Sequence, residues 1–284
     1  MLYRISLLIT VFLFVIHTDV DAQTPAYKIY AVPFAHSGYP FTAADWAQGG
    51  SKTEQLDITF SIWLIKSSTG RCILVDAGFE RDIEDAKEFQ LSSYIRPDSA
   101  LRQLGVKPED VTDVIISHPH WDHIDGVNHF PKAQFWMQKE DFDYFVGRAW
   151  QQPKDTGGFA KRDVRKLTEL NLAGRLKLIS GDNQQILPGI KVFTGSKHTY
   201  GSQYVLVDKI KQPTIIASDN VWIEANIRQL LPPVKGGTLS PAGYIAAMKR
   251  MKTMVKQSKY IIPGHDGVVY KRFPAVGNGI VQIK

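Results

Sequence analysis

The sequence predicts one α/β domain in which sheets and helices pack in layers. The chain has 284 residues, of which 44% are hydrophobic, a size within the range of a single layered unit. No internal repeat or low-complexity tract interrupts it. Short apolar runs typical of strands alternate along the chain with longer segments typical of helices. These three observations favour a single α/β unit over a multidomain chain.

Residues 1–22 are predicted to be a signal peptide. Arg4 supplies a positive start, and the apolar run from residue 5 to residue 16 is too short to span a bilayer. The small residues of Val20-Asp21-Ala22 fit a cleavage site. The predicted mature domain is therefore residues 23–284, located in the periplasm or secreted, without stable membrane insertion. An uncleaved anchor is the alternative.

The first predicted strand covers residues 27–34, and a long loop over residues 35–56 follows it. Tyr39, Phe41 and Trp46 lie in this loop beside the pair Gly49-Gly50. Loops of this length are often functional covers. A cover over a substrate and a loop packed on the core are both compatible with these aromatic residues.

A β-hairpin is predicted next, from strands at residues 58–65 and 71–75 joined through Ser67-Ser68-Thr69-Gly70. Cys72, in the second strand, is the only cysteine, so no intrachain disulfide can form. We expect it to be a small buried side chain. Asp76-Ala77-Gly78 then places a carboxylate at a sharp turn.

The remaining elements complete the α/β alternation. Helices are predicted over residues 80–90, 99–104, 139–150, 160–170 and 241–257. Strands are predicted over residues 112–117, 134–138, 176–179, 190–194, 203–207, 214–218 and 260–262. Phe145 and its aromatic neighbours share one face of the 139–150 helix, where they either pack in the core or line a substrate pocket.

One motif concentrates the candidate metal ligands. His118, His120, Asp122 and His123 follow a continuous apolar strand in the order H-x-H-x-D-H. Residues two apart on extended backbone point to the same side, so His118 and His120 can share one ion. Asp122 and His123 point elsewhere and can serve a second ion. A histidine-rich surface loop without metal is the alternative.

Three further candidate ligands each follow the end of a predicted strand: His198, Asp219 and His265. Strand ends gathered at one edge of a layered fold are where sites are built. We expect His118, His120 and His198 to bind one zinc ion, and Asp122, His123 and His265 to bind the other. Asp219 would then bridge the two ions. His129 lies beyond the completed set and is not expected to bind metal.

This ligand set predicts hydrolysis. Imidazole and carboxylate ligands suit zinc. Zinc lowers the pKa of bound water from about 15.7 to roughly 7, so a shared hydroxide would be available at neutral pH. The residual positive charge of such a site stabilises a developing oxyanion at a carbonyl or phosphoryl centre.

The quoted motifs resemble those of the metallo-β-lactamase superfamily. Asp76-Ala77-Gly78, the H-x-H-x-D-H motif, His198, Asp219 and Gly264-His265-Asp266 occur in that family's order, over residues 27–272. The resemblance implies an αββα four-layer sandwich with a dinuclear metal site at one edge. Within the superfamily the chain is most similar to the N-acyl homoserine lactonases, the quorum-quenching enzymes. True β-lactamases lack a bridging aspartate and often use a cysteine ligand that Cys72 cannot supply.

The resemblance implies that a metal-bridging hydroxide opens a lactone ring and that Asp122 or Asp219 relays the proton. The acyl tail would lie against Tyr39, Phe41, Trp46 and Phe145. One position departs from the family pattern, because Trp222 stands where the lactonases often carry a hydrogen-bonding tyrosine. Either Trp222 donates in its place, or Tyr200 does, or the substrate differs.

The net charge of +6 does not indicate a nucleic-acid partner, because the basic residues are scattered among acids. We therefore expect a small-molecule substrate with an acyl tail. The alternatives are another exported hydrolase, such as an organophosphate triesterase or arylesterase resembling methyl parathion hydrolase, a nuclease, and a non-catalytic metal-binding protein. The sequence leaves the oligomeric state open, a homodimer included.

Overall fold

The structure is a computed structural model that describes residues 25–151, 157–208 and 210–284. The predicted signal peptide lies outside the described residues, so its prediction stays untested. Among the helices of the described residues, none combines the length and hydropathy that crossing a bilayer requires.

The larger of the two sheets is mixed, and most of its strands come from the N-terminal part of the chain. Its order in the described residues is β13-β14-β1-β2-β3-β5-β6-β7, with the short strand β4 paired to β1. The strands are β1 (Tyr27–His36), β2 (Thr59–Ser67), β3 (Cys72–Val75), β4 (Ser93–Tyr94), β5 (Val111–Ile115), β6 (Gln134–Gln138), β7 (Leu176–Ile179), β13 (Ala275–Gly277) and β14 (Ile280–Ile283). The predicted hairpin is present as the antiparallel pair β2 and β3, and β3, β5, β6 and β7 run parallel.

A smaller sheet packs against the large one in the order β12-β11-β10-β9-β8. Its strands are β8 (Gln184–Leu187), β9 (Ile190–Thr194), β10 (Gln203–Val207), β11 (Thr214–Ser218) and β12 (Ile261–Pro263). The α-helices of the described residues are α1 (Ala43–Trp46), α2 (Pro97–Arg102), α3 (Trp121–Ile124), α4 (Lys139–Val146), α5 (Lys161–Leu172), α6 (Glu224–Gln229), α7 (Pro241–Met254) and α8 (Val268–Arg272).

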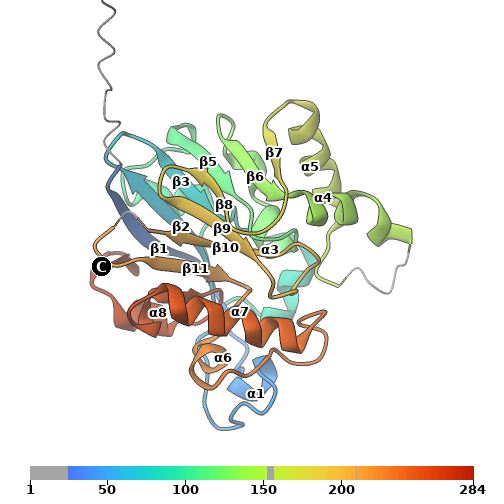
Figure 1. Ribbon diagram of the computed structural model, residues 1–284, viewed down its shortest axis with the longest axis vertical. Helices are drawn as coiled ribbons and strands as arrows, with labels where there is room; N and C mark the ends of the chain where they lie inside the picture. The colour runs from blue at the N-terminus through green and yellow to red at the C-terminus, as the bar shows by residue number, and fades with distance from the viewer. Residues whose placement is uncertain (1–24, 152–156, 209) are drawn as a thin grey trace, which may run out of the picture.

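Three layers of apolar side chains hold the sheets and helices together. The first lies between the large sheet and α2, α4 and α5, the second between the two sheets, and the third between the small sheet and α6 and α7. Figure 1 shows α7 across the small sheet, with α4 and α5 on the far side of the large one. This is an αββα sandwich in one domain, so the predicted fold class is confirmed.

Helix α7 shows how local sequence produces this layering. Pro241 starts the helix, and the Ser240 hydroxyl accepts the Gly243 N–H at 3.0 Å, which satisfies one free backbone donor. The buried side chains are Tyr244, Ala247, Met248 and Met251, at the spacing of one helical face. This face covers the small sheet. The hydroxyl of Tyr244 therefore reaches the end of β11, where it donates to the backbone carbonyl of Asp219.

Two helix predictions are wrong in part. Over residues 80–90 the structure has only a 3-10 helix, Glu84–Phe89. The Glu80 N–H instead donates to the Asp125 carboxylate at 2.8 Å, and Gln90 adopts a left-handed φ of 47° that ends the turn. The predicted helix over 139–150 stops at Val146, because Gly147 leaves the helical region and a 3-10 turn follows.

Candidate metal centre

The structure brings all seven predicted ligand side chains to one edge of the sandwich. Strand β5 delivers the H-x-H-x-D-H motif: His118 and His120 lie in the extended segment after it, and Asp122 and His123 lie in helix α3. Asp219 follows β11, and His265 follows β12. The seven form two groups, within each of which the donor atoms lie within 4.8 Å of one another: His118, His120, His198 and Asp219 in one, and Asp122, His123 and His265 in the other.

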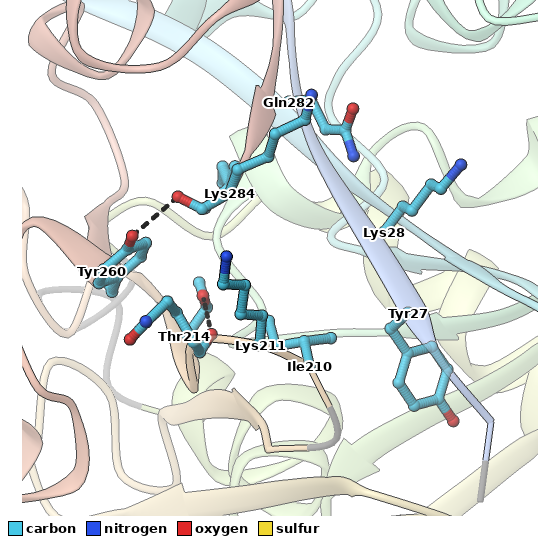
Figure 2. A pocket seen from close by; sticks show the side chains of 10 residues that line it. Tyr27, Lys28, Ile210, Lys211, Thr214, Tyr260, Gln282 and Lys284 are labelled. Atoms are coloured by element: carbon cyan, nitrogen blue, oxygen red, sulfur yellow. Dashed lines mark hydrogen bonds between the residues drawn. The ribbon is translucent and has the colours of Figure 1, made fainter.

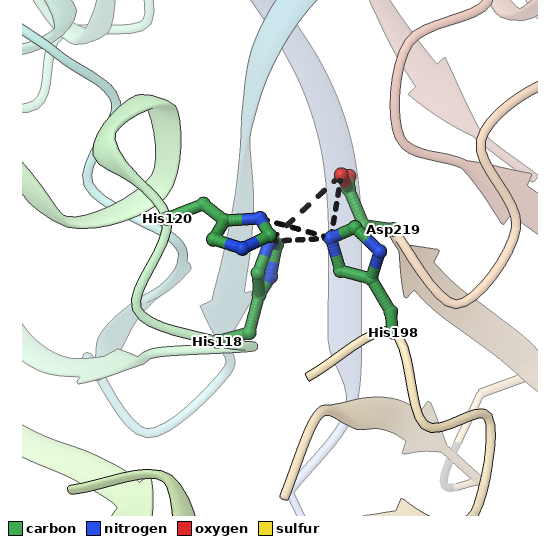
Figure 3. Close-up of side chains that lie close together, drawn as sticks. All are labelled: His118, His120, His198 and Asp219. Atoms are coloured by element: carbon green, nitrogen blue, oxygen red, sulfur yellow. Dashed lines mark hydrogen bonds and ion pairs between the residues drawn. The ribbon is translucent and has the colours of Figure 1, made fainter. Parts of the chain in front are cut away.

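In the first group three imidazole nitrogens face one point (Figure 3). His118 Nε2 lies 3.1 Å from His120 Nδ1 and 3.1 Å from His198 Nε2. His198 Nε2 and His120 Nδ1 are 3.0 Å apart. Three nitrogens cannot all hydrogen-bond one another, because each offers either a proton or a lone pair. The triangle has the size that ligands about 2.0–2.1 Å from a common ion produce.

The second group meets the first at Asp219. Asp219 Oδ1 lies 2.9 Å from His265 Nε2 and 3.3 Å from His123 Nε2. Its other oxygen, Oδ2, lies 3.3 Å from His198 Nε2 in the first group. Asp122 Oδ2 completes the second group, 3.1 Å from His123 Nε2. Asp219 therefore presents one carboxylate oxygen to each group, which is the placement that a bridging ligand needs.

Partners outside the two groups orient the histidine rings. His198 Nδ1 lies 2.7 Å from the Gly237 carbonyl and His123 Nδ1 lies 2.8 Å from Asp76 Oδ2. Both partners are acceptors, so each ring carries its proton on Nδ1 and turns the lone pair of Nε2 inward. The residues therefore fit divalent metal ions: neutral imidazoles and carboxylates with inward lone pairs are donors that suit zinc.

Hydrogen bonds of Asp76 connect the two groups. Its carboxylate is fully buried and accepts the Ser117 N–H at 2.7 Å and the hydroxyls of Ser117 and Ser218, each at 2.9 Å. Ser117 and Ser218 directly precede His118 and Asp219, and Ser117 Oγ lies 2.9 Å from His118 Nδ1. Asp76 and Ser218 both have positive φ, at 62° and 47°, a strained backbone that is stored at functional sites. Sequence reasoning found the Asp76 turn but missed both serines, whose only signal was their position before a ligand.

The two groups differ in their affinity for protons. Burial lowers the pKa of His118 well below its usual value and that of His120 to about 3. Burial lowers the pKa of His198 as well. In the second group burial acts in the same direction on His123, but the carboxylates of Asp122 and Asp219 outweigh it and raise the pKa well above its usual value. Without metal, the imidazoles of the first group are thus held in their neutral form, whereas His123 in the second group favours the charged form.

Trp222 lies against the Asp219 carboxylate. Its indole N–H donates to Asp219 Oδ2 at 2.8 Å, and its ring contacts those of His198 and Trp46, with centroids 5.5 and 5.3 Å apart. The Tyr244 hydroxyl accepts the Trp222 backbone N–H at 2.9 Å and donates to the Asp219 carbonyl at 3.1 Å. Trp222 therefore orients the Asp219 carboxylate, so its N–H is not free for a substrate as the sequence had allowed.

A cavity of about 390 Å³ opens over the two groups. Five of the seven ligands line it together with an aromatic wall that includes Phe41, Trp46 and Trp222. A second cavity, of about 490 Å³, adjoins it and is lined by Tyr200. The prediction that Phe145 lines the site is wrong, because this side chain is fully buried in the core beside Trp150. Tyr39 is 44% exposed and contacts Phe41, outside both linings.

The other two histidines of the described residues lie outside the two groups. His36, placed in a loop by the sequence, is the last residue of β1 and lies 3.2 Å from Asp57. His129 Nε2 lies 2.6 Å from Glu80 Oε1. Neither belongs to the ligand clusters.

A third cavity lies at the opposite edge, where β1 and β11 begin, and has a volume of about 510 Å³. Figure 2 shows Lys28, Lys211 and Lys284 around it, with Tyr27 and Tyr260. The lining side chains of this cavity include no histidine and no acid. It therefore lacks the donors of the metal centre, although it is the larger cavity.

Comparisons with known proteins agree with this geometry. Residues 61–166 match the profile of the metallo-beta-lactamase superfamily. The chain carries a metallo-β-lactamase domain. This match confirms the resemblance seen in the motifs.

The curated relatives include N-acyl homoserine lactonases. One from Bacillus sp is 26% identical over 227 residues, which cover 75% of this chain and 83% of the relative. Another, from Bacillus thuringiensis subsp. kurstaki, is 25% identical over 168 residues, 58% of this chain and 60% of the relative.

Solved structures share the fold at lower identity. An N-acyl homoserine lactone hydrolase with the product N-hexanoyl-L-homoserine at its catalytic metal centre has a TM-score of 0.69 and 20% identity. The superposition covers 89% of this chain and 98% of that one. A dizinc quorum-quenching lactonase has a TM-score of 0.61 and 16% identity, over 85% and 91% of the two chains.

Proposed function

We propose that this protein opens the lactone ring of N-acyl homoserine lactones with the help of two zinc ions. The observation that carries the proposal is the position of Asp219, whose two oxygens face separate groups of imidazoles below one aromatic cavity. The curated relatives named N-acyl homoserine lactonase support the substrate class.

His118, His120 and His198 would hold one ion, Asp122, His123 and His265 the other, and Asp219 both. Bound in this way, two zinc ions supply hydroxide at neutral pH and a positive charge that stabilises the oxyanion of the opening ring. The chain itself fixes these ligands in advance, because Asp76, Gly237 and Trp222 hold their outer atoms. Preorganised ligands need no rearrangement during the reaction.

A proton must move from the attacking water to the oxygen that leaves the ring. We assign this transfer to Asp122, whose carboxylate lines the cavity. Asp219 is the less suitable carrier, because Oδ2 accepts the Trp222 N–H and Oδ1 faces His265. The product is a hydroxy acid, so each turnover releases one proton to solvent.

The acyl tail would lie on the aromatic wall of the first cavity. Phe41 and Trp46 contact each other edge to face, with centroids 5.6 Å apart, and Trp46 also contacts the rings of Trp222 and His265. Trp46 is 8% exposed, so the segment that carries it packs onto the site and is not a free flap. Each CH₂ that the tail buries would contribute about 0.8 kcal/mol.

We also propose that residues 1–22 direct export, which would place the enzyme in the periplasm or outside the cell.

The test is turnover of the purified, zinc-loaded protein, followed by proton release, on N-hexanoyl homoserine lactone and on an aryl phosphotriester. We expect the lactone to be opened and the phosphotriester to be a poor substrate. Asp219→Asn should lower kcat/KM for the lactone at least ~10²-fold, the loss typical of an electrostatic catalytic group. Phosphotriester turnover without lactone opening would instead favour an organophosphate hydrolase.

A further inference from the structure

The metal centre opens into two cavities and not one. The first, of about 390 Å³, and the second, of about 490 Å³, share the lining residues His120, Gly157, His198 and Gly236. His120 and His198 belong to the first ligand group. A substrate carbonyl placed beside His120 and His198 would therefore have one cavity on each side.

A homoserine lactone fills only one of these sides. Its carbonyl carbon and its ring oxygen are joined within one small ring, and a single acyl tail leaves that ring. In the proposed function this tail lies on the wall of Phe41 and Trp46 in the first cavity. The second cavity then has no part of the substrate to bind, although it is the larger of the two.

The second cavity is lined by rings that continue outward from the metal ligands. Phe159 contacts His120 with centroids 5.3 Å apart and Tyr144 with centroids 6.2 Å apart. Tyr144 and Tyr200 lie 4.0 Å apart at an interplanar angle of 37°, and Leu239 closes the lining. Aromatic faces of this kind favour a flat aromatic group.

Glycines border both cavities, because Gly157 and Gly236 belong to both linings and Gly158 and Gly237 follow them in the chain. At Gly158 a Cβ atom would lie 2.8 Å from the His120 ring, and the positive φ of 78° disfavours a side chain there as well. At Gly237 a Cβ atom would lie 2.3 Å from the Trp222 ring. Glycine at these two positions lets the loops pack directly against the His120 and Trp222 rings.

We propose a further activity: hydrolysis of open-chain carboxylic esters that carry an acyl chain on one side and an aromatic alcohol on the other. The acyl chain would occupy the first cavity and the aromatic alcohol the second. This inference rests on the proposed function, because it uses the same ligands and the same nucleophile.

The reaction balances as ordinary ester hydrolysis. Hydroxide from water adds to the acyl carbon, and the bond from that carbon to the alcohol oxygen breaks. The alcohol oxygen takes up a proton, and the acid leaves as a carboxylate, so one proton per turnover is released. No oxidant, reductant or second substrate is needed.

The test compares three probes on the zinc-loaded enzyme by proton release: N-hexanoyl homoserine lactone, ethyl hexanoate and benzyl hexanoate. The two esters share the acyl chain and have alcohols of similar reactivity, so they differ in the group that the second cavity would bind. We expect kcat/KM for benzyl hexanoate to exceed that for ethyl hexanoate at least about tenfold, the gain from burying an aromatic side group.

A variant tests whether the preference for the benzyl ester comes from the second cavity. Leu239 is 56% exposed, so Leu239→Trp should fill that cavity without unfolding the protein. The ratio of kcat/KM for benzyl hexanoate to that for the lactone should fall at least about tenfold. Leu172→Trp, at a side chain that is 82% exposed in α5, is the control and should leave the ratio unchanged.

Lactone opening without a preference for the benzyl ester would overturn this inference and leave the proposed function standing. An unchanged ratio in Leu239→Trp would also overturn it. If none of the three probes is hydrolysed, the proposed function fails and this inference fails with it.

Discussion

The indole N–H of Trp222 occupies Asp219 Oδ2 at 2.8 Å, which makes Trp222 a positioning residue. Trp222→Phe would keep an aromatic ring against Trp46 and His198 but remove the donor. Losing one partner of a metal ligand costs about 10- to 100-fold in metal affinity or activity. We expect a loss of that size in zinc affinity, measured by competition with a chromophoric chelator.

The same titration separates positioning from a direct role toward substrate. If Trp222→Phe binds zinc as the wild type does and loses only kcat, the indole acts on the substrate and the positioning role is wrong. His129→Ala is the matched control, because His129 lies outside both ligand groups and should leave zinc affinity unchanged.

Among the helices, α4 supports the metal centre through Asp141, which contacts the loop that carries His198. Its carboxylate accepts the Thr199 hydroxyl at 2.6 Å and the Gly201 N–H at 2.7 Å, which fixes the loop that carries His198. Burial outweighs these hydrogen bonds and raises the pKa of Asp141 to about 7. The folded protein therefore binds this proton more tightly than the unfolded chain.

A pH dependence of stability follows from this shift. Because the folded pKa is raised, the stabilisation is complete below the ordinary pKa of aspartate and is lost as pH rises through about 7. Asp141→Asn removes this titration, so its free energy of unfolding should fall less than that of wild type between pH 5 and pH 8. The difference in slope is at most about 1.4 kcal/mol per pH unit.

Urea unfolding of both zinc-saturated proteins across this pH range measures the slopes. Asp143→Asn, an exposed change in the same helix, is the control and should follow the wild type. Parallel curves for Asp141→Asn and wild type would show that Asp141 does not titrate there.

The sequence predicts an element well where neighbouring residues determine it, and poorly where a distant segment does. Strands β6, β7, β9, β10 and β11 have the predicted bounds, because each is an apolar or alternating run between turn residues. Strand β8 begins with Gln184 and Gln185 and has no such pattern. Strand β14 was missed as well: it pairs with β1 from the far end of the chain, a partnership that no local pattern encodes.

The candidate site divides in the same way. His118, His120, Asp122 and His123 are adjacent in sequence, and their spacing alone predicts a shared site. The hydrogen bond from Trp222 to Asp219 and the burial of Phe145 both depend on packing between distant segments. Sequence reasoning could name these residues but could not assign their contacts.

For the whole molecule, the two ligand groups should lose metal in a fixed order as pH falls. The carboxylates of Asp219 and Asp122 raise the pKa of His265 and His123, so a metal entering the second group must displace protons. In the first group, burial already favours the neutral imidazoles of His118, His120 and His198, so a metal has no extra proton to displace there. Zinc affinity of the second group should therefore fall first between pH 8 and pH 6.

Cobalt substitution followed by spectroscopy distinguishes the two ions during such a pH titration. We expect one half of the cobalt to leave at higher pH than the other. Loss of both ions in a single step, or earlier loss from the group with His118, would contradict the assignment of protons to the second group.

In the proposed function, seven side chains hold two ions that together open a lactone. Stepwise addition of zinc to the metal-free protein, with opening of N-hexanoyl homoserine lactone followed by proton release, measures how many ions the reaction needs. We expect activity to rise until two zinc ions are bound per chain and then to stay constant. Full activity with one ion bound, or no lactone opening with two, would contradict it.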